Sequence, residues 1–418
     1  MNVAFLLNDL HLSGGVSTVV EHARRLTDRR GWRVVLVLVR EPDVPNWQYR
    51  KLAGLPVLSL DEAAEDRFDV AVATWWETTS GLFALSADRY AYFVQSLEER
   101  FYLPSQHADR LGAAVTHDLP LTYLTEARWI ARALEEGRRG VRCFYVRNGV
   151  DKDVFAVPEQ LDVRLDGPLR ILIEGRADVW FKGVGDALSA VAAMREPRHV
   201  TVVAPDRSGI ADDAAERVVG PLTHEEMAEL YSETDVVLKL SRVEGMFGPP
   251  LEGFHHGATC VVTPVTGHDE YVVHGWNGLV VDWDDVRGAG RQLDLLSRDR
   301  RLLHFLRRNA VQTARAWPSW EQSSEFMAAA LLATHRLPPP DPAAGAGRLL
   351  GDVRAAIEAY RVQLQERDQL EHVAVALDWA RAHPLIGFVR RGRKHRTVRI
   401  LMWPFMPFLR AVRRRLLP

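Results

Sequence analysis

The sequence has 418 residues, 47% of them hydrophobic and 26% charged, which is enough for two domains with separate cores and argues against a small binding module. Cys143 and Cys260 stand in separate apolar runs without metal-ligand spacing, so neither a disulfide framework nor a cysteine zinc site is indicated. The net charge is −2, but residues 381–418 carry eleven Lys or Arg and no Asp or Glu. The first 380 residues therefore carry −13.

The first 160 residues alternate short aliphatic runs with amphipathic stretches. The opening MNVAFLLNDL has no basic residues before its short apolar run, so it predicts a first strand over 2–7 rather than a signal peptide. A helix is expected from about Val16. Further strands are predicted at 34–39, 69–74, 90–95 and 143–147. This alternation predicts βα units around a largely parallel sheet.

The same alternation restarts after the polar, turn-rich stretch at 158–167. Strands are predicted at 169–175, 199–204, 235–240 and 259–264, with helices from Gly183, from about His224 and near 249–256. Helical periodicity then runs from Asp284 to about Arg336. The fold class is therefore α/β, with two Rossmann-like domains at 1–160 and 161–336.

The end of the chain has a different composition. Residues 337–347 are rich in Pro, Ala and Gly and predict a linker, and 348–418 predict a helical extension with a helix over 348–376. In 381–418 the cations are interleaved with Trp and Phe, which favours adsorption to an anionic membrane surface. A solvated extension and a partner-binding or nucleic-acid-binding tail are the alternatives, and no recognition fold for nucleic acid accompanies the charge.

Two glutamates mark the first candidate site. Glu244 and Glu252 stand eight residues apart, one before a Gly/Pro turn and one inside the following predicted helix. Carboxylates held on rigid backbone at such a junction accept hydrogen bonds from vicinal sugar hydroxyls. This spacing also occurs by chance, and two solvated or capping glutamates explain it equally well.

Two cations mark a second candidate site upstream. Arg176 and Lys182 lie in a loop that leads from a predicted strand into the helix predicted from Gly183. A helix N-terminus has free N–H groups and a partial positive charge, so two cations beside it favour diphosphate binding. The alternative is that both are surface cations.

Together these segments resemble glycosyltransferase family 4, a retaining group with the GT-B fold. The resemblance rests on strand-Gly-Arg-x(5)-Lys-Gly-helix, on the segment EGMFGPPLE, on VVTPVTGHDEYV with NGLVV, on NGVDKDVF at 148–155, and on Gly14-Gly15 after the first strand. It extends over about residues 1–335. It implies two Rossmann-like domains that face a cleft, with the nucleotide-sugar donor bound by the second.

The resemblance also implies roles for individual residues. The catalytic residues would be Arg176 and Lys182, which hold the donor diphosphate, and Glu244, which faces the transferred sugar. Glu252 would bind the ribose. The other donor-binding residues would be Gly248, Gly267, His268, Asp269, Glu270, Gly14 and Gly15, with 267–270 lining the sugar pocket through backbone N–H groups. No metal or cofactor is expected, because two cations and a helix end stabilise the leaving diphosphate.

Two departures from the family pattern concern specificity. Many members have Gly-Phe-Gly after the first glutamate, whereas here Met246 is inserted before Phe247. Where many members have a histidine, this chain has Gln95, and that segment is similar to rhamnosyltransferases of bacterial surface-polysaccharide assembly. We place Gln95, Glu98 and Glu99 on the acceptor side, with helix capping and solvated surface as the alternative.

The resulting hypothesis is a retaining, metal-independent hexosyltransferase that takes a sugar from a dTDP-rhamnose or GDP-mannose type donor. The expected acceptor is a saccharide or lipid-linked glycan of a cell-surface polysaccharide, and the expected location is the cytoplasm, peripherally on the inner face of the membrane. A sugar-nucleotide epimerase of GT-B fold and a non-catalytic nucleotide-sugar-binding protein are the alternatives. Asp282 and Asp284 match a metal-binding Asp-x-Asp motif, but we interpret them as an acidic helix cap.

Overall fold

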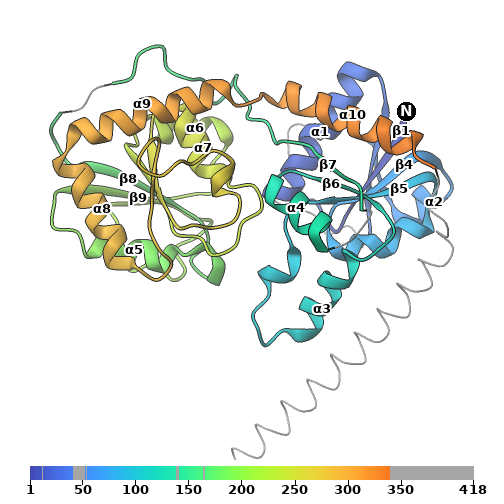
Figure 1. Ribbon diagram of the computed structural model, residues 1–418, viewed down its shortest axis with the longest axis horizontal. Coiled ribbons are helices and arrows are strands. Elements are labelled where there is room, and N and C mark those ends of the chain that lie inside the picture. The colour runs from blue at the N-terminus through green and yellow to red at the C-terminus, as the bar shows by residue number, and fades with distance from the viewer. Residues whose placement is uncertain (12, 41–51, 53, 138–140, 163–164, 339–418) are drawn as a thin grey trace, which may run out of the picture. The chain divides into compact units, whose positions relative to one another are not determined.

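The computed structural model describes residues 1–338 except 12, 41–51, 53, 138–140 and 163–164. Within this part the chain forms two separate parallel β-sheets, each covered by helices (Figure 1). The two α/β domains predicted from the alternating pattern therefore each have a sheet of their own. Most of the predicted linker at 337–347 and all of the extension at 348–418 lie outside the described residues.

The first sheet has seven parallel strands in the order β3-β2-β1-β4-β5-β6-β7. The strands are β1 (Asn2–Leu7), β2 (Arg33–Leu38), β3 (Val57–Ser59), β4 (Arg67–Ala73), β5 (Ser86–Val94), β6 (Thr122–Thr125) and β7 (Cys143–Tyr145). The helices are α1 (Gly14–Arg30), α2 (Leu60–Ala64), α3 (His107–Thr116) and α4 (Arg128–Gly137), with 3-10 helices η2 (Trp76–Ala84) and η3 (Glu98–Phe101). The central strands are apolar on both faces because helices cover both.

The second sheet has six parallel strands in the order β10-β9-β8-β11-β12-β13. The strands are β8 (Leu169–Glu174), β9 (Arg198–Val203), β10 (Arg217–Val219), β11 (Val236–Lys239), β12 (Thr259–Val262) and β13 (Leu279–Val280). Its helices are α5 (Val184–Ala192), α6 (His224–Ser232), α7 (Gly248–His255), α8 (Val286–Arg298) and α9 (Arg300–Ala316), with η4 (Trp180–Lys182) and η5 (His268–Glu270). The strand order reverses between β8 and β11, as in a doubly wound sheet.

The last described helix, α10 (Trp320–Arg336), belongs to the first sheet. Its Met327 and Leu331 are buried in the same apolar cluster as Val19 of α1, and the ring of Trp320 meets the His22 ring edge-on at 5.4 Å. The prediction that the second domain extends to residue 336 is therefore wrong for this helix. The apolar periodicity reveals the buried face of a helix but not which sheet that face covers.

The chain crosses between the sheets twice, and the two crossing segments bond to each other. Val150 donates its N–H to Pro318 O at 3.1 Å, and Trp317 Nε1 donates to Asn148 O at 2.9 Å. Between them, Gly149 lies so close to Trp320 that a Cβ at residue 149 would overlap the backbone of that residue. This close approach gives a physical reason for glycine in the NGVD segment.

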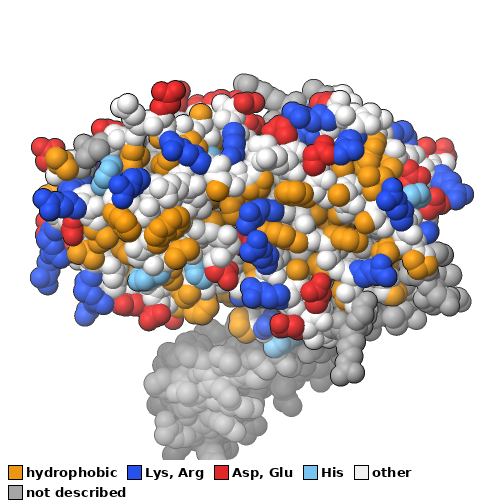
Figure 2. Space-filling model, turned by 45° about the horizontal axis from the view of Figure 1, so that its top comes forward, with side chains coloured by type: hydrophobic (Ala, Val, Ile, Leu, Met, Phe, Trp, Pro, Cys, Tyr) orange, Lys and Arg blue, Asp and Glu red, His pale blue; other side chains and the backbone are white. Residues whose placement is uncertain are grey.

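The described surface carries both signs of charge. On the face shown in Figure 2, basic and acidic side chains are interspersed with hydrophobic ones. No helix in the described ranges is both long and apolar enough to cross a membrane. The strongly basic segment on which the predicted membrane adsorption depends is not among the described residues.

Candidate active site

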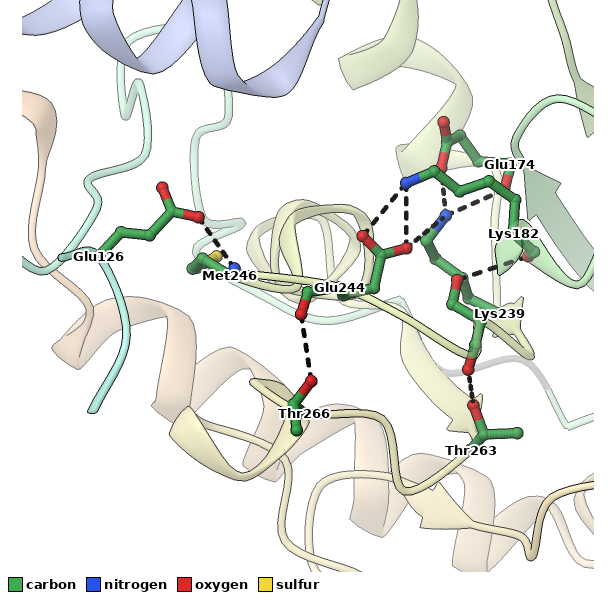
Figure 3. A network of polar contacts seen from close by, with 9 residues as sticks. Glu126, Glu174, Lys182, Lys239, Glu244, Met246, Thr263 and Thr266 are labelled. Atoms are coloured by element: carbon green, nitrogen blue, oxygen red, sulfur yellow. Dashed lines mark hydrogen bonds and ion pairs between the residues drawn. The ribbon is translucent and has the colours of Figure 1, made fainter. Parts of the chain in front are cut away.

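The candidate site lies where the strand order of the second sheet reverses. The neighbouring strands β8 and β11 end at Glu174 and Lys239, and ligands of doubly wound sheets bind at the carboxyl ends of such strands. The loops that follow these strands carry Lys182 and Glu244. Figure 3 shows the four side chains converging, with the Glu244 carboxylate directed at both lysines.

Lys182 and Glu244 form the centre of this group. Lys182 Nζ lies 3.1 Å from each carboxylate oxygen of Glu244. Gly183 makes this position attainable: its φ of 65° is left-handed, and a Cβ would overlap the O atom of Leu240, the residue that follows β11. The Arg242 N–H also donates to Phe181 O at 2.7 Å. The loop that carries Lys182 is thus fixed against the loop that carries Glu244.

Lys239 and Glu174 lie beneath this pair, and the sequence analysis did not select them. Lys239 is only 2% exposed. Its Nζ lies 2.6 Å from a carboxylate oxygen of Glu174 and 3.8 Å from one of Glu244. Burial lowers the pKa of Lys239, but the attraction of Glu174 and Glu244 outweighs burial and the net pKa shift is upward. The lysine within the apolar run DVVLKL could have indicated this ion pair from the sequence, because a buried charge needs a partner.

Glu252 completes the acidic side of the site from helix α7. The Tyr231 hydroxyl donates to its carboxylate at 3.1 Å, and a Cβ on the predicted donor residue Gly248 would lie 4.0 Å from it. Burial raises the pKa of Glu252, whereas the nearby His224 and the Tyr231 hydrogen bond lower it. Glu244 and Glu252 both act electrostatically on the buried Lys239 and favour its charged form.

The N-terminus of α5 lies beside Lys182. The helix begins at Val184, and its N-cap residue Gly183 supplies no side-chain hydrogen bond. The first N–H groups of a helix have no partner within the helix, so this uncapped end favours an anion. Arg176 instead pairs with Asp178 at 2.7 Å, and no hydrogen bond or ion pair among the described residues joins it to the Lys182 pair.

The turn 267–270 is held by both domains. Glu270 accepts hydrogen bonds from the Tyr145 hydroxyl at 2.9 Å and from the backbone N–H that begins α4 at 2.6 Å. The His268 N–H donates to Val265 O at 3.1 Å and the Glu270 N–H to Gly267 O at 3.4 Å. Two of the backbone N–H groups predicted to line a sugar pocket therefore have partners in the protein itself.

Residues of the first domain reach the loop that follows Glu244. Gly14 and Gly15 begin α1, and Gln95 Nε2 donates to Gly15 O at 3.4 Å. A Cβ on Gly245 would overlap the backbone carbonyl of Gln95. The predicted Gly15 and Gln95 are therefore neighbours, and Gln95 lies directly against the donor-side loop.

The Glu98 carboxyl lies inside the first domain. It is 1% exposed and accepts hydrogen bonds from the Trp76 N–H at 2.7 Å and from the Tyr92 hydroxyl. Burial raises the pKa of Glu98 well above its usual range. Its prediction as an acceptor-side residue is wrong, because these two donors hold its carboxyl inside the first domain. Glu99 is half-buried, with a carboxylate oxygen 3.7 Å from His117 Nδ1.

The acidic stretch before α8 contains a helix cap, but not at the predicted residues. Asp285 is the N-cap and accepts the Gly288 N–H at 2.7 Å. Asp284 instead forms an ion pair with Arg242 at 2.6 Å. The prediction that Asp282 and Asp284 cap this helix is therefore wrong by one residue.

One group among the described residues has the spacing of metal ligands. Ligand atoms of Asp69, Asp88 and His335 lie within 4.8 Å of one another. Asp69 already accepts the Asn2 N–H at 2.7 Å, and Asp88 pairs with Arg67 at 2.6 Å. None of the three is a predicted site residue, so this group is separate from the candidate site.

The segment that contains the candidate site matches a known family model. Residues 168–299 match the family model described as glycosyl transferases group 1, and this range includes Lys182, Glu244 and Glu252. A search of curated protein sequences gave no match. The family match therefore concerns the second sheet and its loops.

Comparison with solved structures establishes the fold. HepE from Anabaena, solved in complex with UDP and glucose, is similar with a TM-score of 0.64 and 14% identity over 80% of this chain and 100% of that one. Sucrose-phosphate synthase from Thermosynechococcus elongatus gives 0.62 and 16% over 78% and 97%. The lipopolysaccharide outer core galactosyltransferase WaaB gives 0.58 and 12% over 80% and 99%. The protein thus has the GT-B fold, with two Rossmann-like parallel sheets.

Proposed function

We propose that the protein is a glycosyltransferase that binds a nucleotide-sugar donor on its second domain. The observation that carries this proposal is the Lys182–Glu244 pair beside the uncapped N-terminus of α5. This arrangement lies in the segment that matches glycosyl transferases group 1. A cation and a helix N-terminus bind a diphosphate, and a carboxylate accepts hydrogen bonds from sugar hydroxyls.

The chemistry follows from charge. As the bond between sugar and diphosphate breaks, negative charge develops on the diphosphate, and Lys182 and the N–H groups of α5 stabilise it. Losing one such preorganised donor costs about 3 kcal/mol. Arg176 joins them by leaving its exposed partner Asp178. Glu244 accepts hydrogen bonds from the sugar, Glu252 binds the ribose, and we propose that transfer proceeds with retention and without a metal.

The proposed acceptor is a saccharide or a lipid-linked glycan in cell-surface polysaccharide synthesis. The similarity to a lipopolysaccharide galactosyltransferase supports this class. For the donor, dTDP-rhamnose and GDP-mannose types remain our proposal, and UDP-glucose is added because HepE was solved in complex with it. We further propose that the basic segment 381–418 holds the protein peripherally on the inner, cytoplasmic face of the membrane.

The test is a donor panel. The full chain is incubated with UDP-glucose, dTDP-rhamnose or GDP-mannose and with lipid-linked glycan acceptors, and release of nucleoside diphosphate and glycosylated product are both measured. We expect acceptor-dependent release with one donor, and loss of release in Lys182→Ala. Isomerisation of the donor without an acceptor would instead identify an epimerase. If no donor is consumed with any acceptor, the proposal fails.

A further inference from the structure

A buried carboxyl of the first domain contacts the loop at residues 244–246, which is called here the loop behind Glu244. Glu126 lies between β6 and α4 and is 6% exposed. One of its oxygens accepts the Met246 N–H at 3.0 Å, and the other accepts Asn148 Nδ2 at 2.6 Å. Figure 3 shows Glu126 directed at the backbone of Met246, while the Glu244 carboxylate is directed away toward the lysines. The mechanism proposed above gives Glu126 no role.

Three successive backbone groups of this loop are fixed by side chains. Thr266 Oγ1 donates to Glu244 O at 3.2 Å, and Trp129 Nε1 donates to Gly245 O at 3.0 Å. The third bond is the one from the Met246 N–H to Glu126. Two of these three side chains, Trp129 and Glu126, come from the β6–α4 segment of the first domain. The position of Glu244 is therefore determined in part by a domain to which it does not belong.

A carboxyl is a costly choice for this position. Burial raises the pKa of Glu126 to about 7, although the bonds from Asn148 and Met246 lower it, and the nearby charge of Glu244 raises it further. Glu244 is the charged group that acts on it from the second domain. A glutamine oxygen would accept the same N–H without burying a charge.

We propose that Glu126 is a positioning residue that holds the loop behind Glu244 in register with the first domain, so that donor and acceptor sides align for transfer. This inference rests on the proposed function. Glu126 acts through the backbone of Met246 and does not contact the donor. Its loss should therefore slow the transfer step while the binding of the nucleotide by Lys182 and α5 stays intact.

The test compares Glu126→Ala and Glu126→Gln with wild type in the full chain. We expect Glu126→Ala to lower kcat about 10- to 100-fold with the donor KM within about twofold, the size of effect that a misplaced catalytic group produces. Glu126→Gln should recover most of kcat, since its amide oxygen still accepts the Met246 N–H and Asn148 Oδ1 can turn to accept its amide. A transition in kcat near pH 7 should be present in wild type and absent in Glu126→Gln.

The matched control is Asp294→Ala, which removes another buried carboxylate that accepts two backbone N–H groups, those of Arg195 and Glu196, each at 3.0 Å. It should lose stability but keep kcat. If Glu126→Ala does not fold, Trp129→Phe removes the bond to Gly245 O while keeping an aromatic ring, and it should lower kcat severalfold. Equal kcat in wild type and these variants, or no recovery with glutamine, overturns the inference. An inactive wild type overturns the proposed function as well.

Discussion

Lys182 Nζ lies 3.1 Å from both carboxylate oxygens of Glu244, 62 residues further along the chain. The Lys182 ammonium group, which the proposed donor diphosphate requires, is therefore already paired with the Glu244 carboxylate. When a nucleotide binds, Lys182 has to share its charge between the carboxylate and the incoming phosphates. Because of this competition, removing Lys182 and removing the charge of Glu244 should have different effects on nucleotide binding.

Replacing Lys182 by alanine should abolish most turnover. The variant loses the cation that meets the charge developing on the leaving group, so kcat/KM should fall about 10²- to 10³-fold. Release of nucleoside diphosphate under initial-rate conditions measures this.

Lys152→Ala is the matched control, since within the described part of the chain Lys152 donates only to the carbonyl groups of Ala314 and Arg315, at 3.4 and 3.3 Å. It should retain turnover within about twofold. A Lys182→Ala enzyme as active as this control would place the diphosphate elsewhere.

Replacing Glu244 by glutamine should separate binding from turnover. Removing the negative charge beside Lys182 favours a bound diphosphate by about 1 kcal/mol, or about fivefold in affinity, while sugar transfer slows. Titration calorimetry with UDP, dTDP and GDP gives the affinity, and the donor assay gives the rate. Weaker binding of all three nucleotides together with unchanged transfer would contradict the assignment of Glu244.

Replacing the buried Lys239 by methionine should destabilise the second domain. The change leaves Glu174 without the amine 2.6 Å away that neutralises it, and breaking such a pair costs about 3 kcal/mol. Urea unfolding followed by tryptophan fluorescence measures the loss.

The double variant Lys239→Met with Glu174→Gln removes both charges and should regain part of that stability. A single variant as stable as wild type would mean that the pair contributes nothing to folding.

Glu126 should make stability depend on pH. Its pKa is about 7 in the folded protein against 4.5 ordinarily, so the folded state binds its proton more tightly than the unfolded state does. The contribution to stability is complete below about pH 4.5 and is lost as pH rises through about 7.

Over that interval wild type should lose up to about 3 kcal/mol relative to Glu126→Gln. Unfolding of both proteins from pH 5 to 8 measures the difference. A constant difference across this range would show that Glu126 does not titrate there.

Much of the fold could be predicted from the sequence because its central strands are long and apolar. The predicted run at 169–175 differs from β8 (Leu169–Glu174) by one residue. Four strands were missed, namely β3, β6, β10 and β13, and each has only two to four residues. In so short a strand, pairing with the neighbour decides the structure, and no periodicity can develop.

The site was predictable where a motif concentrates its residues. Glu244, Glu252 and Lys182 lie on two loops that follow neighbouring strands, so the topology brings them together. Glu126 gave no signal, because its partner Met246 lies in the other domain and is contacted through its backbone. Long-range bonds to backbone groups leave no pattern in side-chain type.

The return of α10 to the first sheet has a practical consequence. Met327 and Leu331 cover apolar residues that belong to the first 160 residues of the chain. A fragment that ends near residue 160 would expose this patch to water and should aggregate when expressed alone. The two sheets are therefore not two separable pieces of polypeptide, and a first domain produced by itself has to carry 320–336 joined to it by a designed linker.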